Sequence, residues 1–300
     1  MVRSIAEDIR KQFSTGNIVT RLVIINVAAF VIINLGFFFL THLNAGQTHS
    51  FYHSFTEYIS ISSSSWEVLT RPWSLITHMF SHEGFWHILW NMLFIYWFGS
   101  IVGDFIGDQH ILPLYINGGL AGAIMFFLAT NIFPYATGQT YYAMGASAAA
   151  MAFVVGAATI SPEYNMRLLF LGNVKLKYIA AALVFIDLIG TAGQINTGGH
   201  FGHLGGAFLG FIYVVRLRSG QPFGMWVNDA LLFVEGIFAI SRKPQRNLKV
   251  VHRNEDLLES GPLSKEERLD VILEKIKSQG LSKLTDEEKK FLNEMSNSEQ

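Results

Sequence analysis

Six apolar stretches, each long enough to cross a lipid bilayer, constrain this chain more than any other feature. A membrane-spanning helix needs about 17 to 25 predominantly apolar residues. Such stretches lie at residues 22–41, 85–103, 111–131, 144–160, 176–192 and 201–216. Charged residues make up only 15% of the 300 residues, whereas a soluble domain carries about 25%. We therefore predict an all-α polytopic membrane protein with six spans.

The distribution of Lys and Arg predicts which loops face the cytoplasm, because cytoplasmic loops are enriched in these residues. The opposite loops contain little of either beyond Arg71. An even number of spans returns the chain to the side on which it started, so we expect both termini in the cytoplasm and the protein in the inner (plasma) membrane. The residues that flank the cytoplasmic ends are Arg3, Arg10, Lys11, Arg21, Arg167, Lys175, Lys177, Arg216 and Arg218.

The chain divides into four predicted parts. Residues 1–20 form a cytoplasmic segment that lacks the apolar core of a cleavable signal peptide, and residues 21–218 form the six-helix membrane domain. Within 219–247, the polar residues Asn228, Asp229 and Glu235 recur on one face of an apolar segment. This pattern predicts an amphipathic helix that lies in the membrane interface and does not form a seventh span.

Residues 248–300 have the composition of a small cytoplasmic helical extension. Ser264 with Glu267, and Thr285 with Glu288, match the capping box that begins a helix, and Gly280 is suited to end the first helix. Apolar residues recur at helical spacing in both segments, so we expect a helical hairpin that docks a partner or the membrane domain. They are Leu269, Ile272, Leu273, Ile276, Phe291, Leu292 and Met295.

The loop at 42–84 is long and aromatic, which is not typical of a flexible linker. We expect short interfacial helices in it, anchored by Trp66 and Trp73.

Polar residues open three of the predicted spans at the same depth. His87 and Asn91 open the second span, Ser147 the fourth and His203 the sixth. With the N-terminus inside, these three spans all run inward from the outer surface, so their first turns share one layer of the membrane. A lone serine would be an ordinary packing residue, but ionisable groups inside a membrane are costly and indicate function.

These residue types suit acyl transfer. A serine hydroxyl becomes a nucleophile when a base removes its proton, and histidine is the suitable base at neutral pH. His87 and Asn91 are four residues apart on one helical face. They are suited to donate hydrogen bonds to an oxyanion, together with the backbone N–H of Ser147.

His203 is preferred over His200 as the base because of its position beside a stripe of small residues. The stripe Gly198, Gly202, Gly206 and Gly210 is matched in the fourth span by Ala148, Ala152 and Gly156. Such stripes let helices approach closely, which would place His203 beside Ser147. We expect His200 to be a loop or interfacial residue.

Two other groupings are weighed against this site. His78 and His82 have the spacing of helical metal ligands, but no further ligand falls at suitable spacing in the spans, so no metal site is predicted. We expect both histidines to hydrogen-bond the first loop to the helix below. Asp187 is suited to orient His203 as a third catalytic member, although a structural role is favoured.

Three motifs in the expected spans resemble those of the rhomboid intramembrane serine proteases, over roughly residues 20–217. They are Gly145-x-Ser147, His203-x-x-Gly206-x-x-x-Gly210 and His87-x-x-x-Asn91. The resemblance implies a dyad of nucleophile Ser147 and base His203 that does not require an acidic third member, and we expect neither cofactor nor metal. It also implies an oxyanion hole of His87, Asn91 and the Ser147 amide, with a gate at the fifth helix or the loop above it. Met151 stands where the family often has an aromatic residue, and the tail resembles extensions of some bacterial members.

The predicted function is cleavage of transmembrane segments of other proteins near the outer face of the lipid bilayer. Substrates are expected to have a small residue at the cut and weak helical stability, because a helix must unwind before its carbonyl reaches Ser147. A net charge of −1 argues against a nucleic-acid partner. Two alternatives remain: a catalytically inactive relative that binds membrane proteins for quality control, and a transporter or proton relay built on the same histidines.

Overall fold

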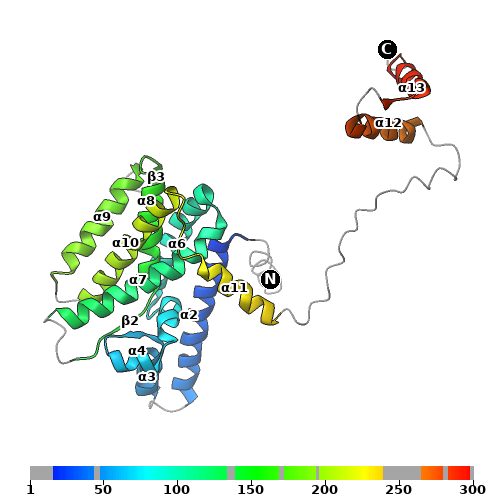
Figure 1. Cartoon of the computed structure of the whole chain (residues 1–300). Helices are drawn as coiled ribbons and strands as arrows, with labels where there is room; N and C mark the ends of the chain where they lie inside the picture. The colour runs from blue at the N-terminus through cyan, green and yellow to red at the C-terminus, as the bar shows by residue number, and fades with distance from the viewer. Residues whose placement is uncertain are drawn as a thin grey trace. The chain divides into compact units, whose positions relative to one another are not determined.

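Helices occupy all six stretches that the sequence predicts to be spans (Figure 1). The computed structural model describes residues 16–43, 48–133, 139–168, 172–193, 196–238, 265–279 and 283–297. The six helices are α2 (Ile18–Leu43), α6 (Phe85–Ile106), α7 (Ile111–Ile132), α8 (Ser147–Ile160), α9 (Leu176–Gly190) and α10 (Thr197–Arg218), with the 3-10 turn η2 (Asp108–His110) before α7. The predicted all-α bundle is confirmed.

Length and apolarity distinguish these helices. Among the described residues, three segments are long and apolar enough to cross a membrane by themselves: Ile18–Phe39, Phe85–Ile106 and Asp108–Ile132. α8 is apolar but has 14 residues, and α9 has 15, fewer than the about 17 that a span requires. α10 has 22 residues but is rich in glycine and histidine. The protein is a membrane protein, and the crossing of the bilayer by α8, α9 and α10 stays a prediction.

The core lies around α8, which packs against α6, α7 and α10. A Cβ atom on Gly206 would collide with the backbone of Ala148, and one on Gly210 with that of Ala152. The lower half of the predicted stripe therefore meets α8 as expected. The upper half does not, because Gly198 faces Phe126 of α7 and Gly202 also faces that helix. One stripe thus serves two helices.

The first loop folds into short helices, as predicted. These are α3 (Thr48–Ile59), α4 (Ser65–Thr70), α5 (Ser74–Thr77) and the 3-10 turn η1 (His78–Phe80). The Trp73 ring donates a hydrogen bond to the Tyr58 carbonyl at 3.0 Å and packs on its ring, while Trp66 is exposed. Their location at the membrane interface stays a prediction.

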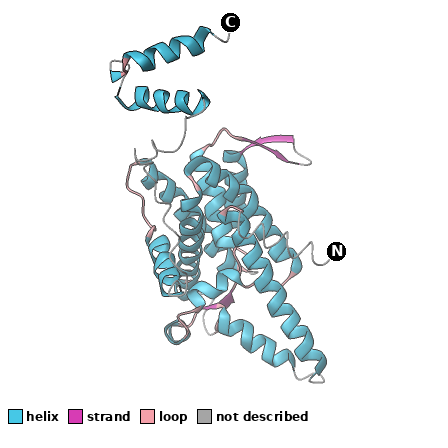
Figure 2. Ribbon diagram, turned by 90° about the vertical axis from the view of Figure 1, so that its right-hand side faces the viewer, coloured by secondary structure: helices cyan, strands magenta, loops and turns pink. Residues whose placement is uncertain are grey.

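Two small antiparallel strand pairs are additions that the sequence did not indicate. β1 (Ile61–Ser62) pairs with β2 (Tyr142–Ala143), which ties the first loop to the residues just before α8. β3 (Asn165–Leu168) pairs with β4 (Gly172–Lys175) in the connection from α8 to α9, and this hairpin extends past the helix ends (Figure 2).

The helix α11 (Trp226–Phe238) falls in the segment predicted to be amphipathic. Its 13 residues are fewer than a span requires. Val227 is buried, whereas Leu231, Leu232 and Phe233 are exposed, and the Asn228 amide donates to the Gln109 carbonyl at 3.0 Å. One side of the helix therefore packs on the protein, and apolar side chains elsewhere on the helix are exposed. Its membrane location stays a prediction.

Residues 265–279 and 283–297 belong to a second compact unit, in which α12 (Lys265–Gln279) is followed by α13 (Asp286–Asn297). The capping box is confirmed: the Thr285 N–H donates to the Glu288 carboxylate at 2.7 Å, and the Glu288 N–H donates to the Thr285 hydroxyl at 3.3 Å. Lys275 pairs with Glu288 across the hairpin, and Ile272 is buried. The predicted cap at Ser264, the stop at Gly280 and the boundary at 247/248 lie outside the described residues.

Candidate functional site

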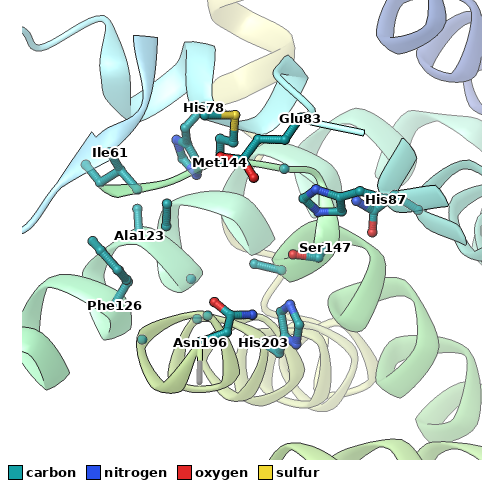
Figure 3. Close-up of a pocket in the computed structure, with 18 of the residues that line it drawn as sticks. Ile61, His78, Glu83, His87, Ala123, Phe126, Met144, Ser147, Asn196 and His203 are labelled. Carbon is teal, nitrogen blue, oxygen red and sulfur yellow. The ribbon is translucent and has the colours of Figure 1, made fainter. Parts of the chain in front are cut away.

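A cavity of about 680 Å³ opens where α6, α8 and α10 begin. Ser147, His203, His87 and Asn91, the four polar residues that the sequence singles out, all line it. Figure 3 shows Ser147 with the His87 ring on one side and the His203 ring on the other. The shared depth predicted for these three helix starts thus brings the four residues into one space.

The backbone before Ser147 is held by the first loop. Gly145 has a φ of +125°, which only glycine adopts without strain. Its N–H donates to the His78 carbonyl at 2.8 Å, and the Ala146 N–H donates to Nε2 of the His82 ring at 3.3 Å. These bonds and the β1–β2 pair fix where α8 begins, so Ser147 is presented from a constrained turn.

The prediction for the two loop histidines is confirmed for His82, and the ring of His78 also joins the first loop to a helix, α7. The His82 ring joins the first loop to the start of α8 through the Ala146 N–H. Nδ1 of His78 contacts the Ser74 carbonyl of its own segment at 2.8 Å. The His78 ring is also hydrogen-bonded to the backbone of Gly119 on α7, and the His78 backbone carbonyl accepts from the N–H of Gly145.

His87 and Asn91 lie against the glycine that precedes Ser147. A Cβ atom on Gly145 would lie 2.7 Å from Nε2 of His87 and 3.6 Å from Nδ2 of Asn91. Asn91 is 5% exposed, and its Nδ2 has no hydrogen-bond acceptor within the described part of the chain. A buried amide donor without an acceptor costs about 1–3 kcal/mol. The cavity therefore contains a donor that a bound oxygen atom would satisfy.

Ser147 and His203 face the cavity from α8 and α10. In the described ranges no hydrogen bond joins the serine hydroxyl to the His203 ring. Catalytic hydrogen bonds are often long before substrate binds and shorten in the reacting complex. The two groups are thus placed on one cavity, and their direct bond is not yet made.

Asp187 on α9 joins two histidines of α10. One carboxylate oxygen, Oδ1, lies 2.8 Å from Nδ1 of His203 and 2.8 Å from Nδ1 of His200. His200 does not lie in a loop, because α10 begins at Thr197 and His200 lies in its first turn, and its location at the membrane interface stays a prediction. The sequence favoured a structural role for Asp187. The structure adds a contact between its carboxylate and the ring of His203, the predicted base.

The same three side chains are the residues that could hold a metal ion. In the described portion, Asp187, His200 and His203 bring three ligand atoms within 4.8 Å of one another. The sequence predicted no set of metal ligands in the spans, and this prediction is wrong as regards geometry. It rested on the spacing of residues within single helices, whereas this set combines α9 and α10. His78 and His82 gather no third ligand there. The hydrogen bonds to Asp187 account for the cluster without an ion.

Three further residues that the sequence singles out support the site from α8 and α10. Met151 is 5% exposed and lies one helical turn below Ser147. Gly206 and Gly210 allow the close approach of the two helices. Trp86, which the sequence did not single out, lines the cavity together with His87. Its place next to a polar residue at a helix start was the available signal.

Two family models match segments of this chain. A family model described as Rhomboid domain matches residues 69–220, about half of the chain, and a Family of unknown function (DUF6576) matches residues 263–298. The "RHOMBOID-like protein 12, mitochondrial" of Arabidopsis thaliana is 32% identical over 163 residues, which cover 50% of this chain and 48% of the relative.

Two further relatives show similar levels of identity. The human "Presenilin-associated rhomboid-like protein, mitochondrial" is 30% identical over 151 residues, which cover 49% of this chain and 38% of the relative. "Rhomboid protein 1, mitochondrial" of Saccharomyces cerevisiae is 27% identical over 174 residues, which cover 53% and 49%. The matched segment spans about half or less of each of these curated relatives.

Proposed function

The chain belongs to the rhomboid family, and we propose that it is an intramembrane serine endopeptidase that cleaves transmembrane segments of other membrane proteins. The observation that carries the proposal is the convergence of Ser147, His203, His87 and Asn91 on one cavity. The buried Nδ2 of Asn91, without an acceptor among the described residues, supports an oxyanion role. A residue held only for packing would not keep an unpaired amide donor beside a cavity.

In the proposed reaction, Nε2 of His203 accepts the proton of the Ser147 hydroxyl as the serine oxygen bonds to the substrate carbonyl carbon. The carbonyl π electrons move onto oxygen, and Asn91, His87 and the Ser147 N–H donate hydrogen bonds to that oxyanion. The intermediate collapses as the C–N bond breaks and the leaving amine takes the proton from His203. Water, activated by the same histidine, then hydrolyses the acyl-enzyme.

The substrates proposed are single transmembrane helices that unwind readily and carry a small residue at the cut. The lining of the cavity includes the small residues Gly122, Ala123 and Gly202. An extended segment also exposes the carbonyl that a helix would keep hydrogen-bonded. Transmembrane proteins and the lipid bilayer are therefore the proposed partners.

The test is cleavage of a model transmembrane substrate in detergent, combined with labelling by a fluorophosphonate. Ser147→Ala and His203→Ala should abolish cleavage, and Ser147→Ala should also abolish labelling. Asn91→Ala should lower kcat about 10²–10³-fold, as expected for the loss of one oxyanion donor. Thr159→Ala is the matched control, because it removes a hydroxyl from the other end of α8. Cleavage at the wild-type rate by Ser147→Ala contradicts the proposal, and substrate binding without cleavage by wild type favours an inactive binding protein.

We also propose that the protein resides in the plasma membrane with both termini in the cytoplasm, since basic residues cluster at one set of helix ends. The relatives named above are mitochondrial. Protease protection of a C-terminal tag in intact cells checks the orientation, and digestion of that tag from outside would contradict it. Truncation after Arg246 should leave proteolysis intact, because the described site residues all precede it.

A further inference from the structure

The outer half of α9 is held to the protein mainly by polar contacts. Its side chains Phe185, Ile186, Leu188 and Ile189 are all exposed by more than half, and Asp187 is the buried residue among them, at 6% exposure. The buried carboxylate accepts from both His200 and His203 of α10. Removing a carboxylate from water costs several kcal/mol, so a buried carboxylate needs hydrogen bonds that offset this cost.

Only one of the two histidines reaches the cavity. His203 lines it, and His200 does not. His200 instead lies against the backbone of α9, where a Cβ atom on Gly190 would lie 2.5 Å from its ring. The two rings on one face of α10, three residues apart, therefore face different surroundings while sharing one carboxylate oxygen.

We propose that Asp187 is a positioning residue that makes the site a triad, and that His200 holds Asp187 in place for this task. The inference rests on the proposed function. A histidine that donates Nδ1–H to a carboxylate keeps Nε2 unprotonated, which is the tautomer that a general base requires. His200 donates the second bond to the same oxygen, so the carboxylate stays aimed at His203 although α9 has few other buried contacts.

Asp187 would stay ionised while His203 gains and loses a proton during the reaction. When Nε2 of His203 accepts the Ser147 proton, the ring becomes a cation that carries hydrogen on both nitrogens. Asp187 remains ionised throughout and stabilises this cation through the existing Nδ1–H bond. The proton then leaves from Nε2 to the departing amine. Asp187 touches neither substrate nor reacting atoms.

The first experiment compares Asp187→Asn, Asp187→Glu and His200→Gln with wild type, using steady-state cleavage of the model transmembrane substrate. Asp187→Asn should lower kcat at least about 100-fold, since the same change in soluble serine protease triads costs about 10⁴, and should leave KM within about twofold because substrate does not contact the carboxylate. Asp187→Glu should recover most of kcat. His200→Gln keeps a donor near the carboxylate and should cost less than about tenfold.

The second experiment detects the tautomer directly. In the Ser147→Ala background, ¹⁵N NMR of the histidine rings should show His203 as the Nδ1–H form, and Asp187→Asn should convert it to a mixture of tautomers. Thermal unfolding of each variant shows whether the fold is intact. A folded Asp187→Asn protein with kcat within threefold of wild type, or with an unchanged tautomer, overturns the inference. Retained cleavage by Ser147→Ala would instead overturn the proposed function itself.

Discussion

α8 and α9 have nearly the same length, 14 and 15 residues, but they are held in the protein in opposite ways. Ten residues of α8 are buried, but only three residues of α9 are buried, namely Leu176, Ala180 and Asp187. α8 begins with the proposed nucleophile, Ser147, and α9 carries the carboxylate that contacts the proposed base. The nucleophile thus lies on a helix fixed by packing, and its supporting carboxylate lies on a helix whose outer half is held mainly by hydrogen bonds.

The difference follows from side-chain size. α8 is built largely of Ala and Gly, so neighbouring backbones approach it closely on several sides. α9 carries bulky apolar side chains that face outward. In lipid such side chains gain nothing by turning inward, since helix association in membranes depends on close packing and polar contacts. Substitutions that affect packing should therefore matter on α8 and much less on α9.

The largest effect is expected where α10 meets α8. Gly206→Val places two methyl groups against the Ala148 backbone, where even a Cβ atom collides, so the helices must separate. Overpacking costs about 1–3 kcal/mol when a core can adjust, and here a backbone would have to move. We expect loss of the folded protein and of cleavage, measured by yield of monodisperse protein and by the thermal unfolding temperature.

Its matched control is Gly36→Val on α2, where nothing lies within 4 Å of an added Cβ atom. This variant should unfold within a few degrees of wild type and retain cleavage. A Gly206→Val protein that behaves like the Gly36→Val protein would show that α8 is not fixed by close packing with α10.

A smaller effect on the free energy of unfolding is expected from truncating one phenylalanine on α8 and one on α9. Phe153 on α8 is 0% exposed, and Phe185 on α9 is 61% exposed. Phe153→Ala should lower the free energy of unfolding by about 3–5 kcal/mol through the cavity that it leaves, whereas Phe185→Ala should change it by less than about 0.5 kcal/mol. Unfolding of both variants in mixed micelles measures the difference, and equal losses would contradict the contrast between the helices.

The smallest effect concerns the connection that leads from α8 to α9. Glu163 pairs with Lys175 at 2.6 Å and with Lys177 in the first turn of α9. Hydrogen bonds from these two lysines lower the pKa of Glu163 from 4.5 to about 2. A lowered pKa in the folded state means that the bridges contribute above pH 4.5 and that this contribution is lost as the pH falls toward 2.

Glu163→Gln tests this bridge. The variant should unfold at a slightly lower temperature than wild type at pH 7, and the difference should shrink between pH 4.5 and pH 3 and at high salt, because the pair is exposed. Asp104→Asn, at an exposed carboxylate on α6, serves as a control outside the connection. A difference that is constant across this pH range would show that Glu163 acts through something other than its charge.

The sequence predicted the membrane bundle because its pattern repeats within each helix. Apolar runs of sufficient length specify helices in lipid, where every backbone polar group must be satisfied internally. The polar starts of three helices also predicted that Ser147, His203, His87 and Asn91 share one layer. Parity of the spans was enough for that inference, since helices that run in the same direction begin at the same depth.

Other features depended on contacts between segments distant in the chain. The β1–β2 pair joins residues near 61 to residues near 142, and two-residue strands have no periodicity to detect. The turn before Ser147 is held by His78 and His82, for which the sequence predicted hydrogen bonds to a helix but not their position at this turn. The cluster of Asp187, His200 and His203 combines two helices, so spacing within either helix did not reveal it.

What the sequence determined by itself was the order of the six helices and the common end of the bundle at which their polar starts lie, because each is a property of one segment and of its direction along the bundle. The tertiary structure alone decided which faces meet. Half of the α10 glycine stripe packs against α7 and half against α8. One oxygen of Asp187 is hydrogen-bonded to two histidines. Helix rotation sets these contacts, and small-residue packing from several neighbours at once fixes that rotation.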